Sequence, residues 1–263
     1  MSLPFFSAND DPGPSFAALL AREGLDPSYE VDAPYDAGGI AHGTTVVAAR
    51  FSDGVVIAGD RRATSGNLIS HRTMEKVFQA DRWSGIAISG AAGPAIEMVK
   101  LFQLQLEHYE KVEGHSLSLE GKANQLSQML RNHLPAAMQG MVVVPIFAGF
   151  DLRRGYGRLF AYDVTGGRYE EEDYIASGSG SLHARTVIRL GHRDDISRDD
   201  SVDLLLRALF TAADEDSATG GPDSMRGIYP IIATITVDGY RSVPEAEIAD
   251  RFAGIVSEFT ERA

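Results

Sequence analysis

The chain has 263 residues, no cysteine and a formal net charge of −13 at pH 7. The absence of thiols excludes disulfides and thiolate catalysis, and the excess of acidic side chains disfavours nucleic acid or an anionic membrane as a partner. No apolar run approaches the roughly 18 residues that a membrane-spanning helix needs, so we expect a soluble, cytoplasmic protein.

The first 43 residues differ in composition from the rest, with five prolines and several acidic side chains. Within them, apolar residues recur at helical spacing between a capping Ser15 and a terminating Gly24, which predicts one short helix. The segment ends in the glycine-containing residues 36–43, whose backbone can bend sharply. We interpret residues 1–43 as a leader that carries one docking helix.

A buried β-hairpin is predicted directly after this leader. Residues 44–49 and 55–58 are apolar and rich in β-branched side chains, and a Ser-Asp-Gly turn at 52–54 joins them. Further strands are expected at 86–88, 142–146, 158–162, 174–176 and 231–237. These are enough strands for two sheets.

Helices are predicted between and after the strands. One apolar stripe follows Pro94, which can occupy a first helical turn. Its members are Ile96, Val99, Phe102, Leu106 and Tyr109. A second helix repeats the pattern from Leu126 to Ala137, and others are expected at 181–190, 201–213 and 245–258. This order of elements favours an α+β fold in which helices cover both outer faces of two paired sheets.

The junction between Gly43 and Thr44 is the first candidate for chemistry. A threonine hydroxyl is a weak nucleophile that needs a base within hydrogen-bond reach. Its own α-amine, with an ordinary pKa of about 7.7–8, can be that base, but only after the preceding peptide bond is cut. A glycine before the threonine leaves the carbonyl to be attacked unhindered. The alternative is that Thr44 is an ordinary strand threonine.

Asp60 and Lys76 are the second candidate feature. Asp60 follows the second predicted strand, close to where the first one starts. A buried lysine paired with this aspartate would lower the pKa of the threonine hydroxyl and keep the amine neutral. The alternative is a turn acid and a surface lysine without contact.

Several motifs together resemble those of proteasome β subunits in order and spacing. They are Gly43-Thr44-Thr45-Val46-Val47, Gly59-Asp60-Arg61-Arg62-Ala63-Thr64, Lys76, Ser89-Gly90 and Asp216-Ser217-Ala218-Thr219-Gly220-Gly221. The leader length and the Arg-Gly-Ile-Tyr-Pro run at 226–230 look most like the bacterial, actinobacterial type. The resemblance covers roughly residues 42–260.

The resemblance implies an N-terminal-nucleophile hydrolase fold, a four-layer αββα sandwich with two mostly antiparallel sheets between helical layers. It also implies two segments, a propeptide 1–43 removed by autocleavage between Gly43 and Thr44, and a catalytic domain 44–263. The implied activity is threonine-type endopeptidase cleavage of unfolded proteins inside a closed chamber.

Residue roles also follow from the resemblance. It implies Thr44 as the nucleophile, Asp60 and Lys76 as the charge pair that tunes it, and the Gly90 N–H as the oxyanion donor. Ser179 and Asp216 match residues that hold the amine and its water. Thr219 matches a third residue of this group, at a position where many relatives have serine, and it retains the hydroxyl.

The same resemblance implies a pocket for the substrate side chain that precedes the scissile bond. Its members are Ala63, Thr64, Met74, Phe78, Ile88, Ala92 and Ile96. Their apolar character favours large apolar side chains in the substrate. The alternative is that they are simply core residues.

The implied partners are other copies of the chain in stacked rings of seven, proteasome α subunits, a ring-shaped ATPase and unfolded protein substrates. Neither a cofactor nor a metal is required. The leader would block Thr44, and its stripe of Phe16, Leu19 and Leu20 is expected to contact neighbouring subunits.

Two other functions remain open. A simpler double-ring bacterial peptidase of the same superfamily has a much shorter leader than this chain. A catalytically silent subunit of the same particle would not need Thr44, Asp60, Lys76, Ser179 and Asp216 together.

Overall fold

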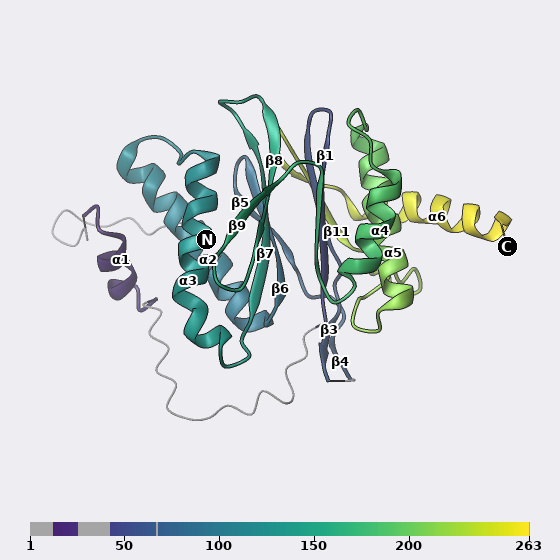
Figure 1. The fold of residues 1–263 in the computed structure, drawn as a ribbon, viewed down its shortest axis with the longest axis horizontal. Helices are drawn as coiled ribbons and strands as arrows, with labels where there is room; N and C mark the ends of the chain where they lie inside the picture. Colours follow the sequence, from purple (N-terminus) through teal and green to yellow (C-terminus); the bar gives the residue numbers. More distant parts are fainter. Residues whose placement is uncertain (1–12, 26–42, 67, 263) are drawn as a thin grey trace.

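The computed structural model describes residues 13–25, 43–66 and 68–262. Figure 1 shows two facing sheets between helical layers, so the predicted four-layer αββα sandwich is confirmed. Helices α2 (Ala92–Glu113) and α3 (Leu119–Ala137) cover one face, and α4 (Ser181–Gly191) and α5 (Arg198–Glu215) cover the other. The last helix, α6 (Glu245–Arg262), extends outward beside α5.

The first sheet contains the predicted hairpin. Its strands, in spatial order, are β10 (Tyr174–Gly178), β1 (Thr45–Phe51), β2 (Gly54–Gly59), β11 (Ile231–Thr236) and β12 (Gly239–Ser242). All its pairings are antiparallel. Because Val46 pairs with Gly59 and Thr45 pairs with Gly178, the start of β1 lies beside the ends of both β2 and β10.

The second sheet is also antiparallel throughout. Its strands, in spatial order, are β5 (Val77–Asp81), β6 (Ser84–Gly90), β7 (Val143–Asp151), β8 (Tyr156–Tyr162) and β9 (Arg168–Glu171). A separate hairpin of β3 (Ala63–Ser65) and β4 (Leu68–His71) projects beside the end of the sandwich in Figure 1.

Three buried layers hold the sandwich together. Val46, Ile57 and Ile146 pack between the sheets. Phe102 of α2 packs edge-on against Phe147 of β7, with ring centroids 5.7 Å apart. On the other face of the sandwich, the buried apolar side chains of α5 pack in one cluster with Val47 and Val56. Burial on both faces explains why β1 and β2 are continuously apolar rather than alternating.

The short helix predicted between Ser15 and Gly24 is confirmed as α1 (Phe16–Arg22). The Ser15 hydroxyl oxygen caps it by accepting a hydrogen bond from the Ala18 N–H at 3.3 Å. Leu19 and Leu20 are buried against Leu104 of α2, so in this structure the stripe docks on the chain itself, where contact with neighbouring subunits was expected. Of the glycine-containing stretch 36–43, only Gly43 is among the described residues.

None of the helices in the described residues is both long enough and apolar enough to cross a membrane.

Candidate active site

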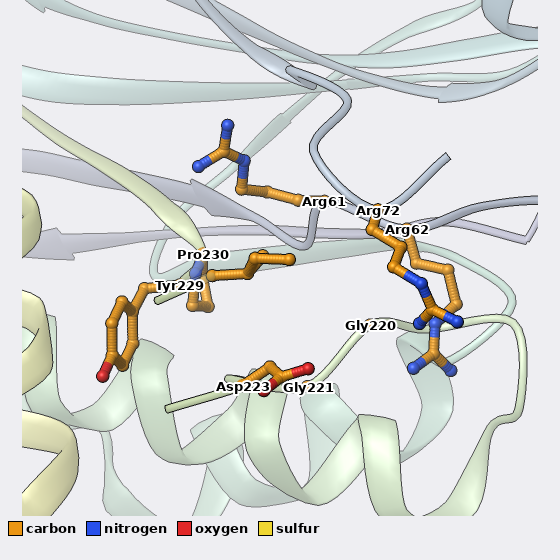
Figure 2. A pocket seen from close by; sticks show the side chains of 9 residues that line it. Arg61, Arg62, Arg72, Gly220, Gly221, Asp223, Tyr229 and Pro230 are labelled. Atoms are coloured by element: carbon orange, nitrogen blue, oxygen red, sulfur yellow. The ribbon is translucent and has the colours of Figure 1, made fainter. Parts of the chain in front are cut away.

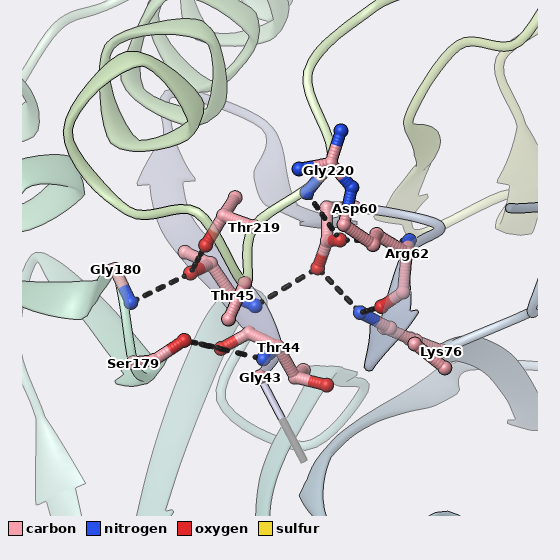
Figure 3. Close-up of polar contacts among 12 residues, drawn as sticks. Gly43, Thr44, Thr45, Asp60, Arg62, Lys76, Ser179, Gly180, Thr219 and Gly220 are labelled. Carbon is pink, nitrogen blue, oxygen red and sulfur yellow. Dashed lines mark hydrogen bonds and ion pairs between the residues drawn. The ribbon is translucent and has the colours of Figure 1, made fainter. Parts of the chain in front are cut away.

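The junction between Gly43 and Thr44 lies where β1, β2 and β10 meet (Figure 3). Thr44 is 5% exposed, and its carbonyl oxygen accepts a hydrogen bond from the Ser179 N–H at 2.8 Å. Its own N–H donates to the Ser179 hydroxyl oxygen at 3.3 Å. The chain is continuous through Gly43, so this nitrogen is a peptide amide and not a free amine.

Lys76 and Asp60 form a buried ion pair. Lys76 is 1% exposed, and its Nζ donates to Asp60 Oδ1 at 2.6 Å and to the Arg62 carbonyl oxygen at 2.5 Å. Burial lowers the pKa of Lys76 from its ordinary 10.5, although the Asp60 carboxylate acts in the opposite direction. The predicted contact is confirmed, and the alternative of a surface lysine without contact to Asp60 is wrong.

Asp60 accepts hydrogen bonds from four groups of the site through its two carboxylate oxygens (Figure 3). Besides Lys76, its Oδ1 accepts from the Thr45 N–H at 2.9 Å. Its Oδ2 accepts from the N–H groups of Arg62 at 2.9 Å and Gly220 at 2.8 Å. Because one oxygen is shared by Thr45 and Lys76, the lysine ammonium is held beside the residue that follows Thr44.

A second carboxylate approaches the junction from the other side. Asp216 Oδ2 accepts hydrogen bonds from the hydroxyls of Ser179 at 2.5 Å and Thr219 at 2.6 Å. Partial burial works against the charged form, but these bonds outweigh it and lower the pKa of Asp216 from its ordinary 3.8. Thr219 thus makes the hydroxyl contact to Asp216 that a serine could also make.

Gly43 is required by a close contact and not by its conformational freedom. A Cβ added at this position would lie 1.7 Å from the Ala218 Cβ. The Gly43 N–H also donates to Thr64 Oγ1 at 3.1 Å, so the residue before Thr44 contacts a residue of the predicted substrate site. The loop that carries Asp216 therefore admits only glycine before Thr44.

Gly90 lies at the end of β6 with a φ of +100°. A Cβ there would lie 2.1 Å from the Val142 carbonyl oxygen. Both observations exclude other residues at this position. Its role as the oxyanion donor stays a prediction.

The predicted pocket residues fall into two groups. Met74, Phe78, Ile88 and Ile96 belong to one apolar cluster between the second sheet and α2. Ala63 and Thr64 lie on β3, and Ala92 begins α2. The expected substrate contacts and the alternative of simple core packing are both compatible with this arrangement.

A small cavity lies behind the Asp60 network and is lined by arginines (Figure 2). It shares Arg62 and Gly220 with that network and also contains Arg61, Arg72 and Asp223. Its volume is about 30 Å³, which is enough for a small number of water molecules.

A role for three groups of this site was not predicted from the sequence. The Thr45 hydroxyl and the Gly180 and Gly220 N–H groups all belong to the hydrogen-bond network of Figure 3. Thr45 and Gly220 stand within the quoted motifs, which was the only signal for them. The sequence does not show which backbone N–H groups take part in a site, because every residue except proline carries one.

Comparison with known proteins gives a consistent result. A family model described as "Proteasome subunit" matches residues 40–226. A protein named proteasome subunit beta from Acidimicrobium ferrooxidans is 56% identical over 253 residues, covering 95% of this chain and 92% of that protein. Proteins of the same name from Streptomyces griseus and Jonesia denitrificans are 57% and 52% identical. They cover 80% and 90% of this chain, and 74% and 80% of their own lengths are matched.

Proposed function

The chain belongs to the proteasome subunit family as a catalytic β subunit of the bacterial type, and from that premise we propose that it is a threonine peptidase with Thr44 as its nucleophile. Residues 1–43 are a propeptide that the chain removes itself by cleaving between Gly43 and Thr44. The observation that carries this proposal is that two carboxylates flank that peptide bond: Asp60 accepts from the Thr45 N–H, and Asp216 accepts from Ser179, whose hydroxyl oxygen accepts the Thr44 N–H.

The proposed mechanism is acyl transfer in two stages. Thr44 Oγ1 attacks the substrate carbonyl while the new α-amine takes its proton and passes it to the leaving amine as the C–N bond breaks, which leaves an ester on Thr44. Water, deprotonated by the same α-amine, then attacks this ester, and the proton returns to Thr44 Oγ1 as the ester C–O bond breaks. The Gly90 N–H stabilises the oxyanion, a contribution of about 3 kcal/mol in comparable sites. The Lys76 ammonium favours the deprotonated hydroxyl and the neutral amine, because a nearby positive charge lowers both pKa values.

Ser179 and Asp216 act on the amine in this proposal. The Ser179 hydroxyl oxygen already accepts the Thr44 N–H in the uncleaved chain, and cleavage turns that amide into the catalytic amine. Because Ser179 gives its own hydrogen to Asp216, its oxygen is oriented to accept from the amine.

The substrate pocket is proposed to prefer large apolar side chains before the scissile bond. Met74, Phe78 and Ile88 offer no hydrogen-bond partner for a charged group, which would be desolvated without compensation. Matched fluorogenic peptides with Tyr, Arg or Asp at that position should be cleaved with the Tyr peptide fastest by about tenfold. A dominant preference for Arg would contradict this pocket assignment.

As a proteasome subunit, the chain assembles into rings with other subunits. We further propose sevenfold β rings stacked back to back, closed by α subunits and supplied with unfolded chains by a ring ATPase in the cytoplasm. Enclosure keeps a nonspecific nucleophile away from folded cellular proteins.

The decisive experiment is the intact mass of the chain after co-expression with its α partner, compared with Thr44→Ala. Loss of residues 1–43 is expected in the first sample and full retention in the second. An unprocessed first sample in fully assembled particles would overturn the proposal and favour a silent subunit.

A further inference from the structure

The Thr45 hydroxyl lies at the centre of the site without an assigned role. Thr45 is fully buried, and its Oγ1 accepts a hydrogen bond from the Gly180 N–H at 3.0 Å. The same oxygen lies 2.6 Å from Thr219 Oγ1. Figure 3 shows these contacts between β1, the start of α4 and the loop after α5.

The direction of each hydrogen bond follows from counting hydrogens. A hydroxyl has one hydrogen, and an ionised carboxylate only accepts. The lowered pKa of Asp216 keeps it ionised, so Thr219 gives its hydrogen to Asp216. Thr45 must therefore donate to Thr219 and accept from Gly180. The result is a chain with one direction, from the Gly180 N–H through two hydroxyls to the Asp216 carboxylate.

This chain ends on the same oxygen that orients Ser179. Asp216 Oδ2 accepts both the Thr219 and the Ser179 hydroxyl hydrogens. Ser179 in turn accepts the Thr44 N–H. If Thr45 no longer donated a hydrogen bond to Thr219, the Thr219 hydroxyl could rotate. Asp216 would then hold Ser179 less firmly.

We propose that Thr45 is a positioning residue whose hydroxyl fixes Thr219 and Asp216, so that Ser179 holds the Thr44 amine in its catalytic orientation. This inference rests on the proposed function of Thr44. It adds a group that acts through Asp216 and never touches the substrate.

The backbone around Thr45 is built for this hydroxyl. A Cβ added at Gly180 would lie 2.5 Å from Thr45 Oγ1 and 2.7 Å from Thr219 Oγ1. The absence of a side chain at position 180 therefore makes room for the two hydroxyls. With Thr45→Val, the buried Gly180 N–H would lose the acceptor that it has in this structure.

The test compares Thr45→Val, which keeps the shape without the hydroxyl, with Thr45→Ser, which keeps the hydroxyl without the methyl group. Both are assembled into particles, and turnover is expressed per processed Thr44 N-terminus counted by mass. We expect kcat to fall about tenfold in Thr45→Val, the effect of losing one net hydrogen bond, with KM within about twofold. Thr45→Ser should recover most of kcat.

Equal kcat values for Thr45→Val and the unmodified chain, or an equal loss in Thr45→Ser, would overturn the inference. If Thr45→Val does not assemble, Thr45→Ala against Thr45→Ser gives the same comparison of hydroxyl with no hydroxyl.

Thr219→Val gives an independent check because it removes the same hydrogen bond between Thr45 and Thr219 by deleting the other hydroxyl. The double variant with Thr45→Val should be about as slow as Thr219→Val alone, whereas multiplied losses would mean separate roles and refute the shared link. Thr44→Ala separates the two proposals. If Thr44→Ala remains processed and active, the threonine mechanism fails. If Thr44→Ala is inactive but Thr45→Val has an unchanged kcat, only the proposed role of Thr45 fails.

Discussion

Lys76 donates to the same Asp60 oxygen that accepts the Thr45 N–H, at 2.6 Å and 2.9 Å respectively. The lysine is 1% exposed and the aspartate is fully buried. A buried ion pair of this kind contributes little to net stability compared with apolar residues, because both charges lose their hydration. We therefore interpret its position as serving the chemistry of Thr44.

Lys76→Met should abolish processing and leave the 43-residue leader attached. It should also lower the free energy of unfolding by about 3 kcal/mol, because the Asp60 charge stays buried without its ion partner. Intact mass and denaturant unfolding measure the two effects. Adding Asp60→Asn to Lys76→Met should recover much of the stability but none of the processing, and recovery of processing would contradict the proposed role of the pair.

Gly43→Ala should slow self-cleavage about 100-fold, because the new Cβ meets Ala218 and displaces the scissile carbonyl by on the order of 1 Å. The measurement is the time course of leader loss by mass. The matched rescue is the double variant Gly43→Ala with Ala218→Gly, which removes the opposing Cβ. If the double variant cleaves as slowly as Gly43→Ala, the contact with Ala218 is not the cause.

The layers of the fold could be predicted from the sequence because their residues are strongly patterned. The continuous apolar runs of β1 and β2 and the stripe of α2 mark buried elements whatever surrounds them. β4 is different, since all four of its residues are exposed, and β9 is a short, largely charged strand. Their pairing depends on a neighbouring strand and leaves no periodic signal in the sequence.

The site could be predicted only in part for a similar reason. The β1–β2 hairpin predicts that Asp60 lies near Thr44, but the contact of Asp60 with Lys76, 16 positions away, was expected only from the family resemblance. The Thr45–Thr219 contact spans 174 positions and depends on how the α5 loop returns to β1. The need for glycine at position 43 likewise comes from Ala218, far along the chain.

Asp216 should contribute a pH-dependent part of the stability. Its pKa is lowered in the folded chain, so its contribution is present above the ordinary value of 3.8 and is lost as pH falls through the lower folded value. The Tm difference between the unmodified chain and Asp216→Asn should therefore shrink as pH is lowered below about 4. Asp53→Asn, at an exposed turn, is the control for simple loss of a charge. An Asp216→Asn difference that stays constant down to pH of about 2 would contradict this assignment.

The docking of α1 on α2 makes a prediction about the uncleaved chain. Leu19 is 1% exposed against Leu104, so Leu19→Asp places a charge in an apolar contact and should undock the helix. The measurement is amide hydrogen exchange in Thr44→Ala, in which we expect residues 1–43 to stay attached. Exchange in α1 should become about 30-fold faster or more, as expected for the loss of about 2 kcal/mol of local stability.

Ala17→Asp is the matched control, because Ala17 is exposed and an acidic side chain is favourable in a first helical turn. It should leave the exchange of α1 nearly unchanged. Leu101 and His108 contact α1 from α2, so amides of α2 near them report the same event from the other side. Equal exchange in Leu19→Asp and Ala17→Asp would mean that this contact does not hold the leader, and its attachment would then depend on residues beyond α1.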